Sequence, residues 1–115
     1  FVGIASQEHA AAMAEIAKEH EMPGWPSVSY KDPNFDPTGY WRGRTWLNIA
    51  YFALKGLKNY GFTELAEEGR ATILSFVRKT PGFICENYNP VTGDAVGVAH
   101  FGWSSAFVIE FILNW

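Results

Sequence analysis

Residues 45–79 read TWLNIAYFALKGLKNYGFTELAEEGRATILSFVRK, and this stretch decides the fold class. Apolar residues recur at spacings of three and four on both sides of Gly61, which predicts two helices. Thr45 and Thr63 are the expected N-caps, and Gly61 is the expected end of the first helix. Helices joined by so short a turn form an antiparallel hairpin. The apolar face expected for the first helix consists of Trp46, Ile49, Ala50, Ala53, Leu57 and Tyr60.

Two further helices are expected, one on each side of this hairpin. Ser6 to about His20 is rich in strong helix formers, with Ser6 as the N-cap. The expected buried stripe of this first helix is narrow. The segment from about Ser104 to Trp115, the second of the two, is instead apolar nearly all round. The last helix should therefore be buried on most faces. The stripe of the first consists of Ala10, Met13, Ala14, Ile16 and Ala17.

Long ordered loops connect these helices. Residues 21–43 contain four prolines and several aromatic side chains, so the segment is neither a helix nor a flexible linker. Residues 83–102 form the second loop. Since no period-two pattern persists, the fold class is all-α. Four helices with such loops make a poor independent domain, and the start at Phe1 without Met is expected to be a cut, so we expect a piece of a larger barrel.

Composition excludes several classes of function. The chain has 115 residues and a formal charge of -3, and Arg42 and Arg44 are its only closely spaced arginines, so nucleic-acid binding is not expected. His9, His20 and His100 are scattered, so we expect neither a metal site nor a cofactor. The apolar run Ala106–Leu113 is too short to span a bilayer. The single cysteine, Cys85, forms no internal disulfide and leaves the compartment open.

Aromatic residues make up 17% of the chain, with five Trp, five Tyr and nine Phe. They can fill a core, because each buries about 150–250 Å². They can also line a cleft in which sugar rings stack on indoles. Composition alone favours the core.

Glu86 is the best candidate for chemistry on local evidence. It precedes Asn87, Tyr88 and Asn89 in a loop stiffened by Pro90. A carboxylate on a stiff loop can accept a proton from water, and neighbouring amides can hold a polar substrate. The alternative is an ordinary surface carboxylate. Cys85 beside it has no evident paired base, which argues against a cysteine nucleophile.

The junction Tyr40–Trp46 places Arg42 between the two indoles of Trp41 and Trp46 in sequence. A loop-to-helix junction also offers free backbone N–H groups that can bind hydroxyls or an anion. The other interpretation is a structural arginine stacked on tryptophan. Spacing does not decide between the two.

Four motifs follow one another along the chain: GYWRGRTW at 39–46, GLKNYG at 56–61, ENYNPVTG at 86–93 and FGWS at 101–104. Together they resemble the C-terminal motifs of glycoside hydrolase family 63. That family includes processing α-glucosidases and relatives that act on α-glucosides or mannosylglycerate. The resemblance implies an (α/α)6 barrel, a six-hairpin toroid shared with trehalases. Residues 1–115 would be the C-terminal portion of one such catalytic domain.

The resemblance also implies an inverting hydrolysis in which Glu86 is the general base that activates water. The general acid would be an Asp from an earlier barrel loop, because the surroundings of Asp32, Asp36 and Asp94 do not match the acid-bearing segment. Trp41, Arg42 and Trp46 would line the sugar subsite. Where this chain has Arg44, the family commonly has Pro. The substrate-binding residues implied are Tyr40, Trp41, Arg42, Trp46, Tyr88 and Trp103.

Three functional hypotheses follow. The first is a glycosidase for α-linked glucose or mannose with Glu86 as its base. The second is a non-catalytic sugar-binding remnant, or one assembled with a partner, motivated by the missing acid. The third is a trehalase-like hydrolase. The expected partners are a carbohydrate and either the remainder of the barrel or a second copy.

Overall fold

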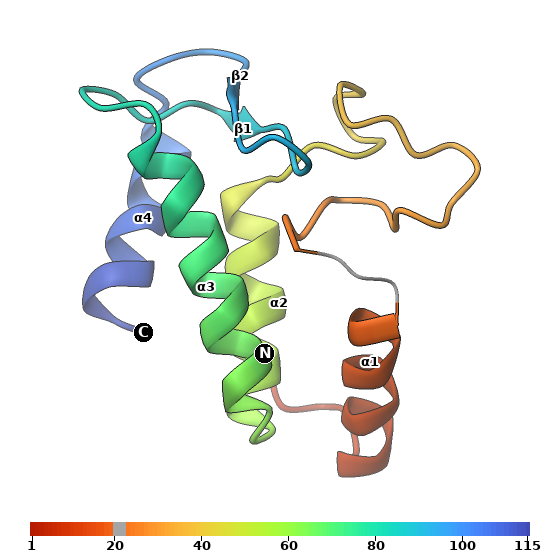
Figure 1. The fold of residues 1–115 in the computed structure, drawn as a ribbon. Helices are drawn as coiled ribbons and strands as arrows, with labels where there is room; N and C mark the ends of the chain where they lie inside the picture. Colours follow the sequence, from red (N-terminus) through yellow and green to blue (C-terminus); the bar gives the residue numbers. More distant parts are fainter. Residues whose placement is uncertain (20–22) are drawn as a thin grey trace.

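The computed structural model describes residues 1–19 and 23–115, and the described part is mostly helical as predicted. In Figure 1, α2 and α3 lie side by side with α4 next to them, and α1 lies at the lower right, below the long loop. A two-strand hairpin lies near one end of the helices. The elements are α1 (Gln7–Glu19), α2 (Leu47–Asn59), α3 (Thr63–Arg78), β1 (Asn87–Tyr88), β2 (Ala95–Val96) and α4 (Gly102–Leu113).

Helix α1 matches its prediction at the N-terminus. The Ser6 hydroxyl accepts a hydrogen bond from the His9 backbone N–H at 3.2 Å, which is the expected cap. Only Ala10 and Ala14 of the predicted stripe are buried, whereas Met13 is 63% exposed and Ile16 52% exposed. His20, the predicted end of this helix, and the first two residues of the predicted loop lie outside the described residues.

The α2–α3 hairpin is confirmed, but both predicted caps are wrong. Trp46 and Phe62 are the N-cap residues, and neither makes a side-chain cap hydrogen bond. Thr45 instead donates its hydroxyl to the Gly24 carbonyl, so a contact with the long loop replaces the cap. Gly61 ends the first helix with a φ of +90°, as predicted. The buried face of α2 is shifted from the predicted one and consists of Leu47, Ala50, Tyr51 and Leu54.

Helix α4 differs most from expectation. Ser104, Val108 and Phe111 are its buried residues, while Ile109, Ile112 and Leu113 are 53%, 56% and 73% exposed. The prediction of burial on most faces is therefore wrong for the described part of the chain. The outer face of α4 remains apolar and uncovered.

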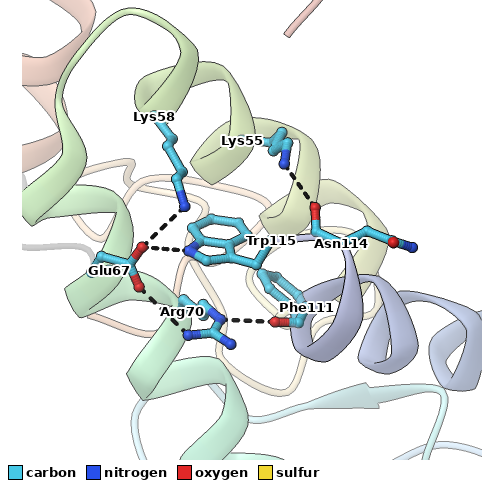
Figure 2. A network of polar contacts seen from close by, with 7 residues as sticks. All are labelled: Lys55, Lys58, Glu67, Arg70, Phe111, Asn114 and Trp115. Atoms are coloured by element: carbon cyan, nitrogen blue, oxygen red, sulfur yellow. Dashed lines mark hydrogen bonds and ion pairs between the residues drawn. The ribbon is translucent and has the colours of Figure 1, made fainter.

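A polar network fastens the end of α4 to the α2–α3 hairpin (Figure 2). Glu67 accepts hydrogen bonds from the Trp115 indole at 2.6 Å and from Lys58 at 3.2 Å. Arg70 pairs with Glu67 at 3.5 Å and donates to the Phe111 carbonyl at 2.8 Å. The Lys58 ammonium also lies 4.8 Å from the centre of a Trp115 ring. This network joins α2, α3 and the C-terminal residues.

The hairpin of β1 and β2 is an element that the sequence did not predict. Asn87 pairs with Val96 and Tyr88 with Ala95. Each strand has two residues, too few to show a period-two pattern. Tyr88 also forms an isolated bridge with Thr45, with N–H···O distances of 2.9 and 3.0 Å. The bridge holds the Glu86 loop against the start of α2.

Candidate active site

The backbone of Glu86 is fixed on both sides. Its N–H donates to the Val98 carbonyl at 2.9 Å, and its carbonyl accepts from the Ser104 hydroxyl at 2.8 Å. The residue is 8% exposed, so the interpretation of Glu86 as an ordinary surface carboxylate is wrong. The Glu86 backbone is thus held by Val98, which follows β2, and by Ser104 of α4.

The Glu86 side chain meets the first motif through Tyr40. The Tyr40 hydroxyl donates a hydrogen bond to Oε1 of Glu86. This bond is the largest of the causes that raise the pKa of Tyr40, and Arg44 opposes it. Spacing along the chain gave no sign of this contact, because the two residues are 46 positions apart.

Three aromatic side chains form a wall beside the carboxylate. Trp41 and Trp46 stack with ring centroids 4.0 Å apart at 7°, and Tyr40 meets Trp46 edge-on at 4.8 Å. Trp46 is buried and donates its indole N–H to the Tyr40 carbonyl at 2.9 Å. Trp41 is 51% exposed. An exposed indole on a rigid support is suited to stacking with a flat apolar surface.

Arg42 does not lie between the two indoles. It pairs with Asp36 at 3.3 Å, and its side chain is 65% exposed. Its stacking on tryptophan is therefore not observed. The Thr38 hydroxyl and N–H, more than Arg42, hold the pKa of Asp36 below its ordinary value.

Arg44, rather than Arg42, makes a cation–π contact at this junction, and its partner is a tyrosine. Its guanidinium lies 5.6 Å from the centre of the Tyr40 ring. It donates to the Thr38 carbonyl at 2.9 Å and to Oδ1 of Asn87 at 3.3 Å. The Nδ2 atom of Asn87 is buried and has no hydrogen-bond partner among the described residues. Arg44 thus links the aromatic wall to the residue after Glu86.

Within the described part of the chain, the remaining predicted substrate-binding residues, Tyr88 and Trp103, make no hydrogen bond to the Glu86 carboxylate. Tyr88 is fully buried, and its hydroxyl accepts from the Cys85 N–H at 3.3 Å, which is a bracing position. Trp103 is 50% exposed beside Phe101, at the start of α4 next to Ser104. Burial raises the pKa of the Cys85 thiol, which disfavours a thiolate nucleophile.

The described residues contain no group of three or more His, Cys, Asp or Glu side chains placed to hold a metal ion. Within the same part of the chain, no helix is long and apolar enough to cross a membrane. The chemistry available at the site is that of a held carboxylate beside exposed aromatic rings.

Solved structures with a similar fold include members of glycoside hydrolase family 63. The mannosylglycerate hydrolase of Thermus thermophilus from glycoside hydrolase family 63, solved with glucose, matches 98% of this chain with a TM-score of 0.84 and 29% identity. The match covers 28% of that chain. A second structure of that hydrolase, with Tris and D-glycerate, gives a TM-score of 0.83 at 32% identity.

Sequence relatives agree with the structures. Mannosylglycerate hydrolases of Selaginella moellendorffii and Thermus thermophilus are each 35% identical to this chain, over 99% and 95% of its length. The mannosyl-oligosaccharide glucosidase of Saccharomyces cerevisiae is 28% identical over 85% of the chain. The chain spans 24% and 26% of the lengths of the two hydrolases.

The fold and the motifs define a segment of a helical-barrel glycoside hydrolase of family 63. Residues 1–104 match the model of the mannosylglycerate hydrolase MGH1-like glycoside hydrolase domain, and the chain belongs to that family. The predicted resemblance is confirmed.

Proposed function

We propose that this chain supplies the general base of an inverting glycosidase that acts on α-linked mannosides or glucosides. Glu86 would take a proton from water as the water oxygen attacks the anomeric carbon, while a separate acid protonates the leaving oxygen. The observation that carries the proposal is the Glu86 carboxylate, held by Tyr40 beside the aromatic wall.

The aromatic wall supports a sugar subsite. Trp41 rests on buried Trp46 and keeps about half of its surface exposed. The C–H face of a pyranose ring can stack there with little ordering cost, because the indole is already fixed. Arg42 is exposed close by and can donate to sugar hydroxyls. The relatives include mannosylglycerate hydrolases and a glucosylglycerate hydrolase, and their substrates suggest the class of substrate for this chain.

The general acid is proposed to come from another part of a barrel of which residues 1–115 form the C-terminal portion. An inverting pair is separated by about 6.5–9.5 Å to leave room for water. Asp36 is engaged by Thr38 and Arg42, and Asp94 is a solvent-exposed residue of the β1–β2 turn near Lys79. Neither is a good acid candidate.

Replacing Glu86 with Gln in the intact enzyme tests the proposal. Turnover of mannosylglycerate should fall by about 10²–10⁴-fold, since the amide cannot accept the proton. Glu68→Gln is the matched control, because Glu68 is exposed on α3. Near-normal turnover by folded Glu86→Gln enzyme would exclude Glu86 as the base.

A sugar-binding role without hydrolysis is the second candidate, and the exposed Trp41 stacked on Trp46 favours it. Titration of the isolated chain with maltose or mannosylglycerate, followed by tryptophan fluorescence, distinguishes the two. Binding without hydrolysis supports the second role for the isolated chain. Hydrolysis of an α-glucoside by the isolated chain would contradict both the remnant hypothesis and the missing acid.

A further inference from the structure

The two oxygens of the Glu86 carboxylate lie in different surroundings. Oε1 accepts the hydrogen bond from the Tyr40 hydroxyl. Oε2 lies beside Gly97, where a Cβ atom would come within 2.6 Å of it. Oε1 is therefore hydrogen-bonded to a phenol, and Oε2 lies beside a glycine, which has no side chain.

We propose that Tyr40 is a positioning residue for Glu86, rather than only a sugar contact as the sequence suggested. The Tyr40 hydroxyl fixes Oε1 and leaves Oε2, beside Gly97, as the oxygen that accepts the proton from water. The proposal rests on the proposed function of Glu86 as the base. It assigns different tasks to the two carboxylate oxygens.

Tyr40 is itself held in a fixed orientation. Its carbonyl accepts the Trp46 indole N–H at 2.9 Å, and its ring packs edge-on against the same indole. The Arg44 guanidinium lies over the Tyr40 ring, 5.6 Å from its centroid. Arg44 is anchored in turn by the Thr38 carbonyl. A hydroxyl on a ring that is held in this way can set the rotamer of its acceptor with little further loss of entropy.

The protonation state of Tyr40 suits this task. Its hydrogen bond to Glu86 and the nearby carboxylate charge raise the pKa of the phenol above its ordinary value of 10.0. The hydroxyl therefore keeps its proton at neutral pH and remains a donor. A carboxylate oxygen that accepts such a charge-assisted bond is held more firmly than one bonded only to water.

Tyr40→Phe in the intact enzyme tests the assignment, because it removes the hydroxyl and keeps the ring of the aromatic wall. We expect kcat for mannosylglycerate to fall about 10- to 100-fold, the range for loss of a hydrogen bond to a charged group, with little change in KM. Tyr51→Phe is the matched control. Tyr51 also donates to a carboxylate, Glu110 at 3.3 Å, but between α2 and α4. This control should keep kcat near the wild-type value.

The double variant Tyr40→Phe/Glu86→Gln shows whether Tyr40 acts through Glu86. If it does, the tyrosine substitution should change kcat less than twofold in the Glu86→Gln background, because coupled residues are not additive. A full tenfold loss in both backgrounds, or a rise in KM with kcat unchanged, would make Tyr40 an independent substrate contact and overturn the inference. Normal activity of Glu86→Gln alone would instead remove the base assignment, a result distinct from either.

Discussion

At the scale of single residues, Gly97 lies directly beside the side chain of the candidate base, Glu86. Its φ is +78°, a region that side chains rarely adopt. An added Cβ would lie 2.6 Å from Oε2 and 3.0 Å from Cβ of Glu86. Alanine at this position therefore brings both backbone strain and a direct clash with the carboxylate.

Gly97→Ala should lower kcat at least about tenfold and destabilise the protein by about 1–3 kcal/mol. Gly82→Ala is the matched control, since its φ is +102° and no atom lies within 4 Å of the added carbon. The control carries the strain without the clash, so it should lose stability but keep kcat. Steady-state rates and urea unfolding of both variants provide the measurement. Equal kcat values in the two variants would show that the space beside Oε2 is unimportant.

Sequence reasoning at this scale proposed both Glu86 and Tyr40 as site residues, but not the contact between them. Glu86 could be proposed because its motif belongs to an ordered set of four. Tyr40 and Gly97 reach Glu86, and Arg44 reaches Tyr40 and Asn87, only through tertiary contacts that local spacing does not encode. Thr45 shows the opposite error, since a good local cap found a tertiary acceptor in Gly24.

At the scale of elements, Glu67 is the centre of the network that fastens α4 to the hairpin. The Trp115 indole N–H, followed by Lys58 and Arg70, holds the pKa of Glu67 below its ordinary value of 4.5. A carboxyl whose folded pKa is lowered stabilises the fold above its unfolded pKa. That contribution is lost as the pH falls from about 4.5 through the folded value.

Glu67→Gln should lower the free energy of unfolding at pH 7 by about 1 kcal/mol or less, because the side chain is partly exposed to solvent. The difference in unfolding free energy from the wild type should shrink as the pH falls from about 5 to about 3, because Glu67 then becomes protonated. Urea unfolding across this range, with Glu68→Gln as the control, measures it. A constant difference at every pH would contradict an ionic role for Glu67.

The helices themselves were largely predictable, because capping residues, glycine stops and apolar spacing are local signals. Helix α1 begins after its predicted cap, Ser6, and the α2–α3 hairpin turns at Gly61 as predicted, although the two threonine caps predicted for the hairpin are wrong. The buried face of α2 was misplaced because Tyr51 and Leu54 pack against partners that spacing alone cannot reveal. The β1–β2 pair is too short for any periodic signal.

At the scale of the whole molecule, the described part of the chain is a slab of 41 × 36 × 20 Å. A helix with its side chains is about 10–12 Å across, so 20 Å holds no more than two layers. Apolar side chains on α4 are left uncovered, which fits a segment of a barrel wall. Single exposed apolar residues are ordinary, but a row of them along one helix marks an interface.

The isolated chain should therefore self-associate. Light scattering after size exclusion is expected to show oligomers, and Ile109→Glu/Leu113→Glu should shift them toward monomer by placing charges on the outer face of α4. Val91→Glu is the control, because Val91 is 64% exposed in the β1–β2 turn away from α4. A monomeric wild-type chain that binds no hydrophobic dye would contradict the interface.

The bridge between Thr45 and Tyr88 has a consequence for the order of folding. The α2–α3 hairpin needs only local contacts, and once formed it brings the two ends of the bridge together, which lowers the entropy cost of closing so long a loop. The hairpin can therefore nucleate first, and the strand contacts around Glu86 follow. Amide hydrogens of Thr45 and Tyr88 should exchange faster than those in the middle of α2, so local opening would disassemble the site while the scaffold stays folded.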